Sequence, residues 1–247
     1  INSKLSIDRI PNTSKATLAF TDENATISVH IISASNVGLS ASPAFTWAPN
    51  NSIASISIAN THEQRAMLAF VDGTNVRMHT LRLQGSSVTT LADNVIPVQT
   101  TDPRSVSMCA LTPTRSILTF HDSGIGYAVG ITTLADGTSI DIGPVLSFTD
   151  TFDSIANVSA CKVTDTLALV AYRDRNSGNI HTQHMTVTDA TGGGGGGVNP
   201  IPADPFTDIM LTIADSSVYD GAGSVADYDG RVLAIDYSAT DAYYIAY

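Results

Sequence analysis

The chain of 247 residues has no stretch close to the roughly 20 consecutive apolar residues that a membrane helix needs. Charged residues make up 14% of it, and it contains two cysteines and one tryptophan. Lys and Arg number 12 against 23 Asp and Glu, which gives a net charge of −11. Such a surface would repel a phosphate backbone. These shortages predict a domain that neither inserts into membranes nor binds nucleic acid.

Signatures of metal, nucleotide and catalytic sites are also missing. There is no His-Glu-x-x-His, Cys-x-x-Cys, EF-hand or Gly-x-Ser-x-Gly pattern. The glycine run at 192–197 lacks the Lys and helix of a phosphate-binding loop. His30, His79 and His181 fall at nearly equivalent places in the repeats described below, so we expect them to be spread apart. The sequence predicts no cofactor, no metal and no catalysis.

What the chain does contain is a recurring phrase of apolar and small residues with an aromatic residue and an aspartate. Its copies lie at 18–22, 68–72, 118–122 and 170–174, with a degraded copy at 233–237. The aromatic residues Phe20, Phe70, Phe120 and Tyr172 are 50, 50 and 52 residues apart. A period near 50 in units that resemble strands is typical of a β-propeller.

We therefore predict an all-β fold, a single five-bladed β-propeller over residues 1–247, with four-stranded blades and an incomplete last blade. The expected blades cover residues 3–48, 53–100, 103–150, 154–213 and 216–247. In each blade a Ser-rich first strand lies nearest the axis, where small side chains fit. The recurring phrase forms the second strand, which is apolar on both faces because each blade packs between two others.

Prolines mark the predicted fourth strands, at Pro43, Pro97, Pro144 and Pro205. Proline cannot donate to a strand ladder, so these strands should lie at the outer edge. The glycine run at 192–197 is expected to be a mobile loop. The fifth repeat offers strands at 218–226, 231–236 and 243–247 but no fourth, from which we expect that the natural chain continues beyond this sequence.

An aspartate ends each of the first four copies of the phrase, at Asp22, Asp72, Asp122 and Asp174. A ring of carboxylates on one face could bind a cation or a polar ligand. However, a residue that recurs in every blade serves what every blade needs. We therefore expect each aspartate to accept hydrogen bonds from backbone N–H groups of its own hairpin.

The links between blades differ from one blade to the next, as a binding site requires, and they share a face with these hairpins. They contain the only tryptophan, an arginine and several carboxylates: Trp47, Asp102, Arg104, Asp150 and Asp153. An aromatic platform beside Asp and Arg suits sugar recognition. If the chain has a ligand site, we expect it here.

Cys109 and Cys161 lie 11 residues before Phe120 and Tyr172, at equivalent positions of adjacent blades. Equivalent positions in neighbouring sheets are usually too far apart for a disulfide. We expect two buried, unpaired cysteines.

Four sequons, at Asn12, Asn24, Asn50 and Asn157, are candidates for glycosylation. Together with the acidic balance and the small number of lysines, they favour a secreted or cell-surface protein.

The segment 159–174, Ser-Ala-Cys-Lys-Val-Thr-Asp-Thr-Leu-Ala-Leu-Val-Ala-Tyr-Arg-Asp, resembles an uncharacterised repeat of large algal and bacterial surface and secreted proteins. Those repeats are similar in carrying an "ALVAYRD" phrase, a Gly-rich hairpin and a "PVVF"-like strand. The resemblance is strong in the fourth repeat, while the others have Phe for Tyr and lack the Arg. It implies an extracellular propeller used in adhesion or assembly, and no reaction. Sialidase, WD and kelch signatures are missing.

These features predict a non-catalytic extracellular module whose partners are other protein chains, as one unit of a larger assembly or in adhesion. Two alternatives remain: a lectin-like propeller that binds glycans through the links between blades, and a glycoside hydrolase with carboxylates at the mouth of an axial channel.

Overall fold

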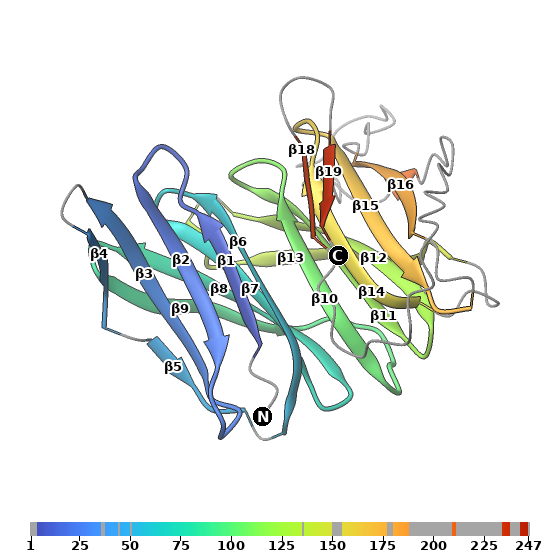
Figure 1. Ribbon diagram of the computed structural model, residues 1–247, viewed down its shortest axis with the longest axis horizontal. Coiled ribbons are helices and arrows are strands. Elements are labelled where there is room, and N and C mark those ends of the chain that lie inside the picture. The colour runs from blue at the N-terminus through green and yellow to red at the C-terminus, as the bar shows by residue number, and fades with distance from the viewer. Residues whose placement is uncertain are drawn as a thin grey trace, which may run out of the picture.

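The computed structural model describes residues 4–35, 38–43, 45–49, 51–134, 136–149, 155–176 and 180–187, and the backbone of three short strands at 209–210, 234–237 and 243–246. Four antiparallel sheets are arranged as the blades of a β-propeller and follow one another in chain order (Figure 1). The first strands of successive blades lie side by side, so they are the inner strands.

The strands of each blade follow one another in a meander. Blade 1 comprises β1 (Leu5–Arg9), β2 (Lys15–Thr21), β3 (Ile27–Ser35), β4 (Gly38–Ala41) and β5 (Phe45–Trp47). Blade 2 comprises β6 (Ile53–His62), β7 (Arg65–Asp72), β8 (Asn75–Gln84) and β9 (Ser87–Val95). Blade 3 comprises β10 (Pro103–Ala110), β11 (Arg115–Asp122), β12 (Ile125–Thr133) and β13 (Ile140–Ser147). Blade 4 comprises β14 (Ile155–Lys162), β15 (Leu167–Asp174), β16 (Ile180–Val187) and β17 (Ile209–Met210).

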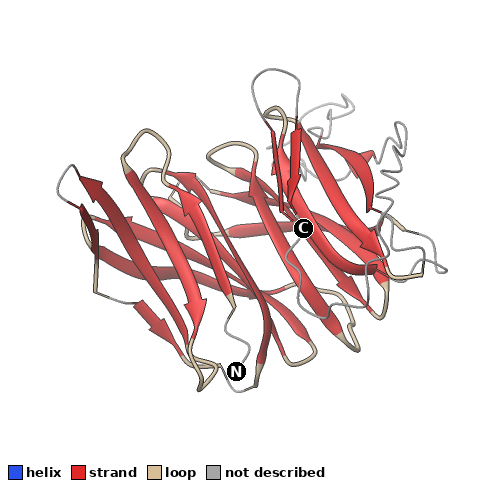
Figure 2. Cartoon of the chain, viewed as in Figure 1, coloured by secondary structure: helices blue, strands red, loops and turns tan. Residues whose placement is uncertain are grey.

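The described residues contain strands and no helix (Figure 2), and hence no helix suited to crossing a membrane. The prediction of an all-β propeller is confirmed, and the recurring phrase forms the second strand of all four blades. The fifth copy lies in β18 (Ala234–Tyr237), which pairs with β19 (Tyr243–Ala246) in a two-stranded hairpin. The predicted first strand at 218–226 and the glycine run at 192–197 lie outside the described residues.

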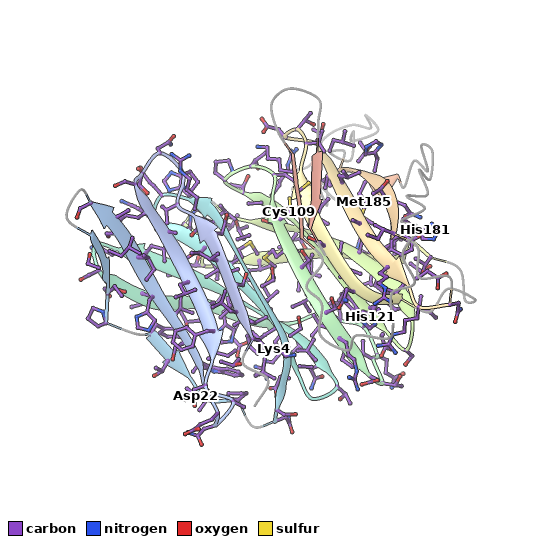
Figure 3. All side chains as sticks on the ribbon, in the orientation of Figure 1. Lys4, Asp22, Cys109, His121, His181 and Met185 are labelled. Atoms are coloured by element: carbon purple, nitrogen blue, oxygen red, sulfur yellow. The ribbon has the colours of Figure 1, made fainter. Side chains whose placement is uncertain are left out.

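The hairpins between second and third strands lie at the same end of the blades as the links that enter the next blade. Figure 3 shows Asp22 of blade 1 and His121 of blade 3 toward this end, with Cys109 farther along β10. The links contribute backbone as well as side chains to this end, because Asp122 at the end of β11 bonds to Thr101 and Asp102 just before β10.

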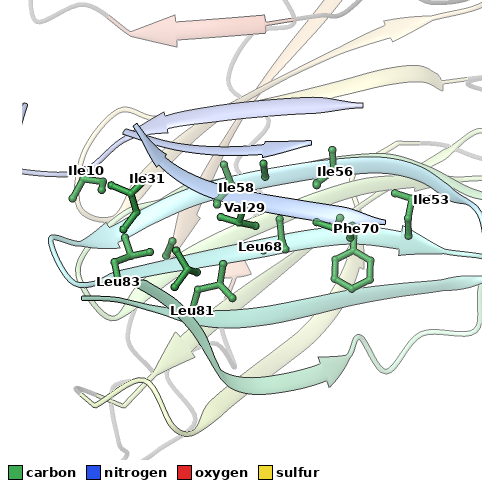
Figure 4. Close-up of a cluster of buried hydrophobic side chains, with 14 residues drawn as sticks. Ile10, Val29, Ile31, Ile53, Ile56, Ile58, Leu68, Phe70, Leu81 and Leu83 are labelled. Carbon is green, nitrogen blue, oxygen red and sulfur yellow. The ribbon is translucent and has the colours of Figure 1, made fainter. Parts of the chain in front are cut away.

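Blade 2 is apolar on both faces because it packs between blades 1 and 3. Ile56, Ile58, Leu68 and Phe70 of blade 2 point toward blade 1 and pack against residues such as Val29 (Figure 4). The alternate residues, among them Ala59, Met67 and Val71, pack against blade 3. A further cluster joins blade 3 to blade 4. We call the face of a blade that is turned toward the preceding blade its back face, and the face that is turned toward the next blade its forward face.

Serine side chains join the inner strands of neighbouring blades. Ser6 Oγ accepts the N–H of Ile58 at 3.0 Å, Ser57 Oγ that of Met108 at 2.9 Å, and Ser107 Oγ that of Ala160 at 3.0 Å. Ser55 and Ser105, two residues earlier, do the same for Val106 and Val158. We expected small side chains on these strands for reasons of space. The structure adds a second reason. An inner strand has no neighbouring strand on its axial side, and the serine hydroxyls accept the backbone N–H groups that such a strand would otherwise bond.

The outer strands only partly match the prediction from proline. Pro144 lies within β13, where the register with β12 shifts. Pro43 separates β4 from β5, and both of these strands pair with β3. The prediction for Pro97 is wrong, since β9 ends before it at Val95. The turn at Gly85, with φ at +64°, starts β9 directly after β8, so β9 already forms the outer edge before the chain reaches Pro97, and residues 98–102 form the link to blade 3. Pro205 lies outside the described residues.

Candidate functional site

The recurring aspartates fall into two pairs with different roles. Asp22 Oδ1 accepts the N–H groups of Asn24 and Thr26 at 2.9 and 2.8 Å, and Asp174 Oδ1 accepts that of Asn176 at 2.8 Å. These two carboxylates therefore hold their own hairpins.

Asp72 and Asp122 instead hold the link that arrives from the preceding blade, which corrects the expectation for these two residues. Asp72 Oδ1 accepts Nδ2 of Asn51 at 2.9 Å. Asp122 accepts the N–H groups of Asp102 at 2.6 Å and Thr101 at 3.1 Å. Because the links come from different blades, spacing along the sequence could not show this pairing. All four carboxylates have structural partners, so they do not form a free ring for a cation.

Among the predicted ligand residues, Asp102 and Arg104 lie together. Arg104 Nε donates to both carboxylate oxygens of Asp102 at 3.0 and 3.1 Å, and the two side chains are 58% and 60% exposed. An exposed pair of this kind contributes little to stability and is available to a ligand. Asp150 and Asp153 lie outside the described residues.

Trp47 does not belong to that group, which contradicts the predicted aromatic platform. Its ring lies 4.8 Å from that of Phe70 and 5.0 Å from that of His79, between blades 1 and 2. The guanidinium of Arg77 lies 5.6 Å from the centre of the Trp47 ring. Phe148 packs on Tyr172 at 5.6 Å in the same way between blades 3 and 4. Trp47 is therefore a packing residue of the junction.

Arg77 and His79, which both contact Trp47, also contact the carboxylate of Asp93. Asp93 lies 2.7 Å from Arg77 Nη2 and 3.2 Å from His79 Nε2. Burial lowers the pKa of His79, although Asp93 acts in the opposite direction. His79 is thus a neutral partner of this pair at physiological pH.

His30, His79 and His181 lie on the third strands of blades 1, 2 and 4 and are therefore spread apart, as predicted. His30 and His79 are counterparts, since they pair with Leu18 and Leu68. His181 pairs with Tyr172 and so occupies the place of Arg77. Within the described residues, no group of three or more His, Cys, Asp or Glu side chains could hold a metal ion.

His121 is a buried histidine that sequence reasoning did not single out. Its Nε2 lies 2.9 Å from the carbonyl oxygen of Ala156 in blade 4, so Nε2 donates and Nδ1 carries no proton. Burial lowers the pKa of His121 to about 4, and Arg175 and Arg104 act in the same direction. The ring therefore joins two blades as a neutral donor.

Cys109 and Cys161 are buried and no disulfide joins them, as predicted. Burial raises the pKa of the Cys109 thiol to about 12. A thiol with such a pKa is a poor nucleophile at neutral pH.

Two of the sequon asparagines are placed where a glycan could attach. Asn12 and Asn24 are exposed in hairpins of blade 1, whereas Asn157 is half-buried on the inner strand β14. Asn50 lies outside the described residues.

Among the described residues, exposed apolar side chains gather on the back face of blade 1, which sequence reasoning missed. Leu5 and Ile7 are 67% and 59% exposed, whereas their counterparts in blade 2, Ile56 and Ile58, are 7% and 3% exposed. The contrast continues on the outer strand, where Leu39 is 79% exposed.

We define the open face as the exposed residues Leu5, Ile7 and Leu39 with the partly buried Leu18, Phe20 and Ile32 between them. The counterpart of Leu39 is Val88, which is buried in blade 2. Exposed apolar side chains gathered on one face are typical of a protein interaction site. The sequence carries the alternation that makes this face apolar, but it does not show that none of the described blades covers this face.

Comparisons with known proteins give no family. No family model matches this chain, and no curated protein matches it. Among solved structures, Hsv2p of Kluyveromyces lactis is similar over 74% of this chain and 56% of its own, with 12% identity and a TM-score of 0.42. A protein of Lactobacillus plantarum is similar over 86% of this chain and 70% of its own, with 9% identity and a TM-score of 0.40. The chain thus spans little more than half of the Hsv2p chain, and such low similarity says nothing of function.

Proposed function

We propose that this chain is a non-catalytic interaction module, secreted or at the cell surface, that holds other protein chains in assembly or adhesion. The observation that supports it is the open face. Its counterparts at the next junction are buried by the preceding blade, so the face has the chemistry of a protein interface. In this proposal five repeats form the module, and the fifth is an incomplete last blade over residues 216–247 that contains β18, which lies beside β14.

The polar residues of the blades favour this function over catalysis. On the four described inner strands, Asp8 is the only carboxylate, and its Oδ2 accepts the N–H of Asn60 at 2.6 Å. A glycosidase needs two carboxylates across its substrate. The exposed pair of Asp102 and Arg104 still supports the alternative of glycan binding. Trp47 does not support it, because its ring packs on Phe70 between two blades.

The test compares three forms of the domain as immobilised bait for extracellular proteins of the source organism: wild type, Ile7→Asp and Leu134→Asp. Leu134 is 59% exposed on blade 3 and serves as the matched control. We expect a discrete set of proteins that wild type and Leu134→Asp retain and Ile7→Asp loses. If the three baits retain the same proteins, and glycan binding depends on Arg104, the lectin alternative replaces this proposal.

A further inference from the structure

We propose that a pocket between blades 1 and 2 binds a small zwitterion, an aliphatic α-amino acid. In this proposal Lys15 holds the carboxylate of the ligand and Glu63 holds its ammonium group, while buried aliphatic residues hold its side chain. The pocket lies at the end of the blades opposite to the links, where first strands turn into second strands. It is separate from the open face, so the inference goes beyond the proposed function.

The pocket has an apolar floor and a polar rim, with a volume of about 270 Å³. Ile10, Ile31 and Leu83 form the floor and are 2%, 3% and 3% exposed. Figure 4 shows these three side chains together at one end of the cluster between the two blades. Drug-sized ligands occupy pockets of about 300 to 1,000 Å³, so this pocket suits a smaller ligand with an aliphatic group. The rim consists of Thr13, Lys15, Glu63, Gln64, Gln84 and Gly85.

Lys15 is the cation of this pocket, and the next junction shows how its counterpart is used. Lys15 begins β2 and Arg65 begins β7, and each lies five residues before the aromatic residue of its phrase. Arg65 is buried, and its Nη1 donates to the carbonyl oxygen of Leu134 in blade 3 at 2.9 Å. Lys15 is half-buried, and no described residue pairs with its ammonium group. That group is therefore available to an anionic ligand.

The length of the connection opposite each cation explains the difference. In blade 3 the loop between β12 and β13 covers Arg65 so closely that a Cβ on Gly137 would lie 2.9 Å from Cδ of Arg65. In blade 2 the corresponding connection is the two-residue turn of Gly85 and Ser86 between β8 and β9. The short turn leaves open the space that the longer loop fills at the next junction.

A carboxylate on the other blade supplies the second charge. Glu63 is exposed in the turn between β6 and β7, and it forms no ion pair with Lys15 although both line the pocket. A ligand with a single charge would be repelled by one of these two groups, whereas a zwitterion complements both. The side-chain amides of Gln64 and Gln84 can donate to a carboxylate or accept from an ammonium group.

Hydrogen bonds fix the walls of the pocket within the protein itself. The N–H of Ile10 donates to the carbonyl oxygen of Lys15 at 2.9 Å, and Thr13 Oγ1 donates to that of Ile10 at 2.9 Å. On blade 2, the N–H of Leu83 donates to the carbonyl oxygen of Gln64 at 2.8 Å. A site held in this way loses little conformational entropy when a ligand binds.

The first experiment follows the methyl groups of Ile and Leu by NMR while leucine is added to the purified chain. We expect the signals of Ile10, Ile31 and Leu83 to shift and to saturate, with a Kd of about 1 mM or below for a ligand of this size. The methyl signals of Leu134 are the internal control and should not move. The absence of a saturable shift up to about 20 mM leucine, or shifts only outside the pocket, overturns the inference.

Analogues of leucine test each part of the recognition. 4-Methylpentanoate lacks the ammonium group, 3-methylbutylamine lacks the carboxylate, and glycine lacks the side chain. Each should bind about tenfold more weakly than leucine or worse, because each loses a charged hydrogen bond or the apolar contact. If either of the singly charged analogues binds as tightly as leucine, the ligand is not a zwitterion and the inference is wrong.

Two variants test the residues that carry the charges. Lys15→Met and Glu63→Gln keep much of each side chain but remove its charge, so each should weaken leucine binding about tenfold or more. Lys4→Met and Glu23→Gln are the matched controls, since Lys4 precedes β1 and Glu23 follows β2 at the other end of blade 1. Both controls should bind leucine like wild type. Equal weakening in variants and controls would reflect the net charge of the chain and contradict the site.

Discussion

At the scale of the residue, small polar side chains on the inner strands hold the blades together. Each inner strand has a partner strand on one side only, so its outward N–H groups need other acceptors. Ser55, Ser57, Ser105 and Ser107 supply them across two junctions. The same hydrogen bond from a backbone N–H to a serine hydroxyl recurs at both junctions. This hydrogen bond explains why serine recurs on the inner strands better than a need for small side chains does.

We expect Ser57→Ala to lower the free energy of unfolding by about 1 to 2 kcal/mol, because the buried N–H of Met108 loses its acceptor. Urea unfolding followed by circular dichroism measures the change. Ser87→Ala, on the exposed start of β9, is the control and should stay within about 0.5 kcal/mol of wild type. Equal stabilities for the two variants would show that the hydroxyl contributes nothing.

At the scale of the element, the blades meet closely enough that one strand position admits no side chain. A Cβ on Gly126 of β12 would lie 2.5 Å from the Phe148 ring and 2.7 Å from Cδ1 of Ile155. Phe148 follows β13 and Ile155 begins β14, so the glycine sets how closely blades 3 and 4 approach.

Gly126→Ala should therefore cost about 1 to 3 kcal/mol of stability by overpacking this junction. In a Phe148→Leu background the added methyl finds room, so the cost should shrink. A double-mutant cycle of denaturant unfolding measures the coupling. Effects that add within about 0.5 kcal/mol would contradict the contact.

How far the sequence predicts these elements follows from what each one depends on. Strands β2, β7, β11 and β15 were predictable because the phrase and its alternation are local. The contacts of Trp47 and Asp122 depend on which blade each link approaches. The spacing of residues along the sequence does not show this. The alternation of Leu5 and Ile7 matches that of Ile56 and Ile58, so only the arrangement of the blades shows that one pair is uncovered.

At the scale of the whole molecule, the chain is a row of similar junctions with unlike ends. One end of the described blades is the open apolar face of blade 1, and at the other end β18 lies beside β14 of blade 4. Stability in such a row is a sum over junctions, so a titrating group at one junction affects the unfolding of the whole.

His121 lies at such a junction, and its pKa gives a pH dependence with a definite sign. The folded pKa of about 4 is below the ordinary value of 6.5, so the unfolded chain binds the proton first as the pH falls. The free energy of unfolding should therefore drop by about 2 kcal/mol between pH 7 and pH 5, and His79, whose pKa is also lowered, acts in the same direction. His121→Gln keeps a donor for the carbonyl of Ala156 but cannot take up a proton. Urea unfolding at the two pH values should show a smaller loss for the variant than for wild type, and an equal loss would place the proton uptake on other groups.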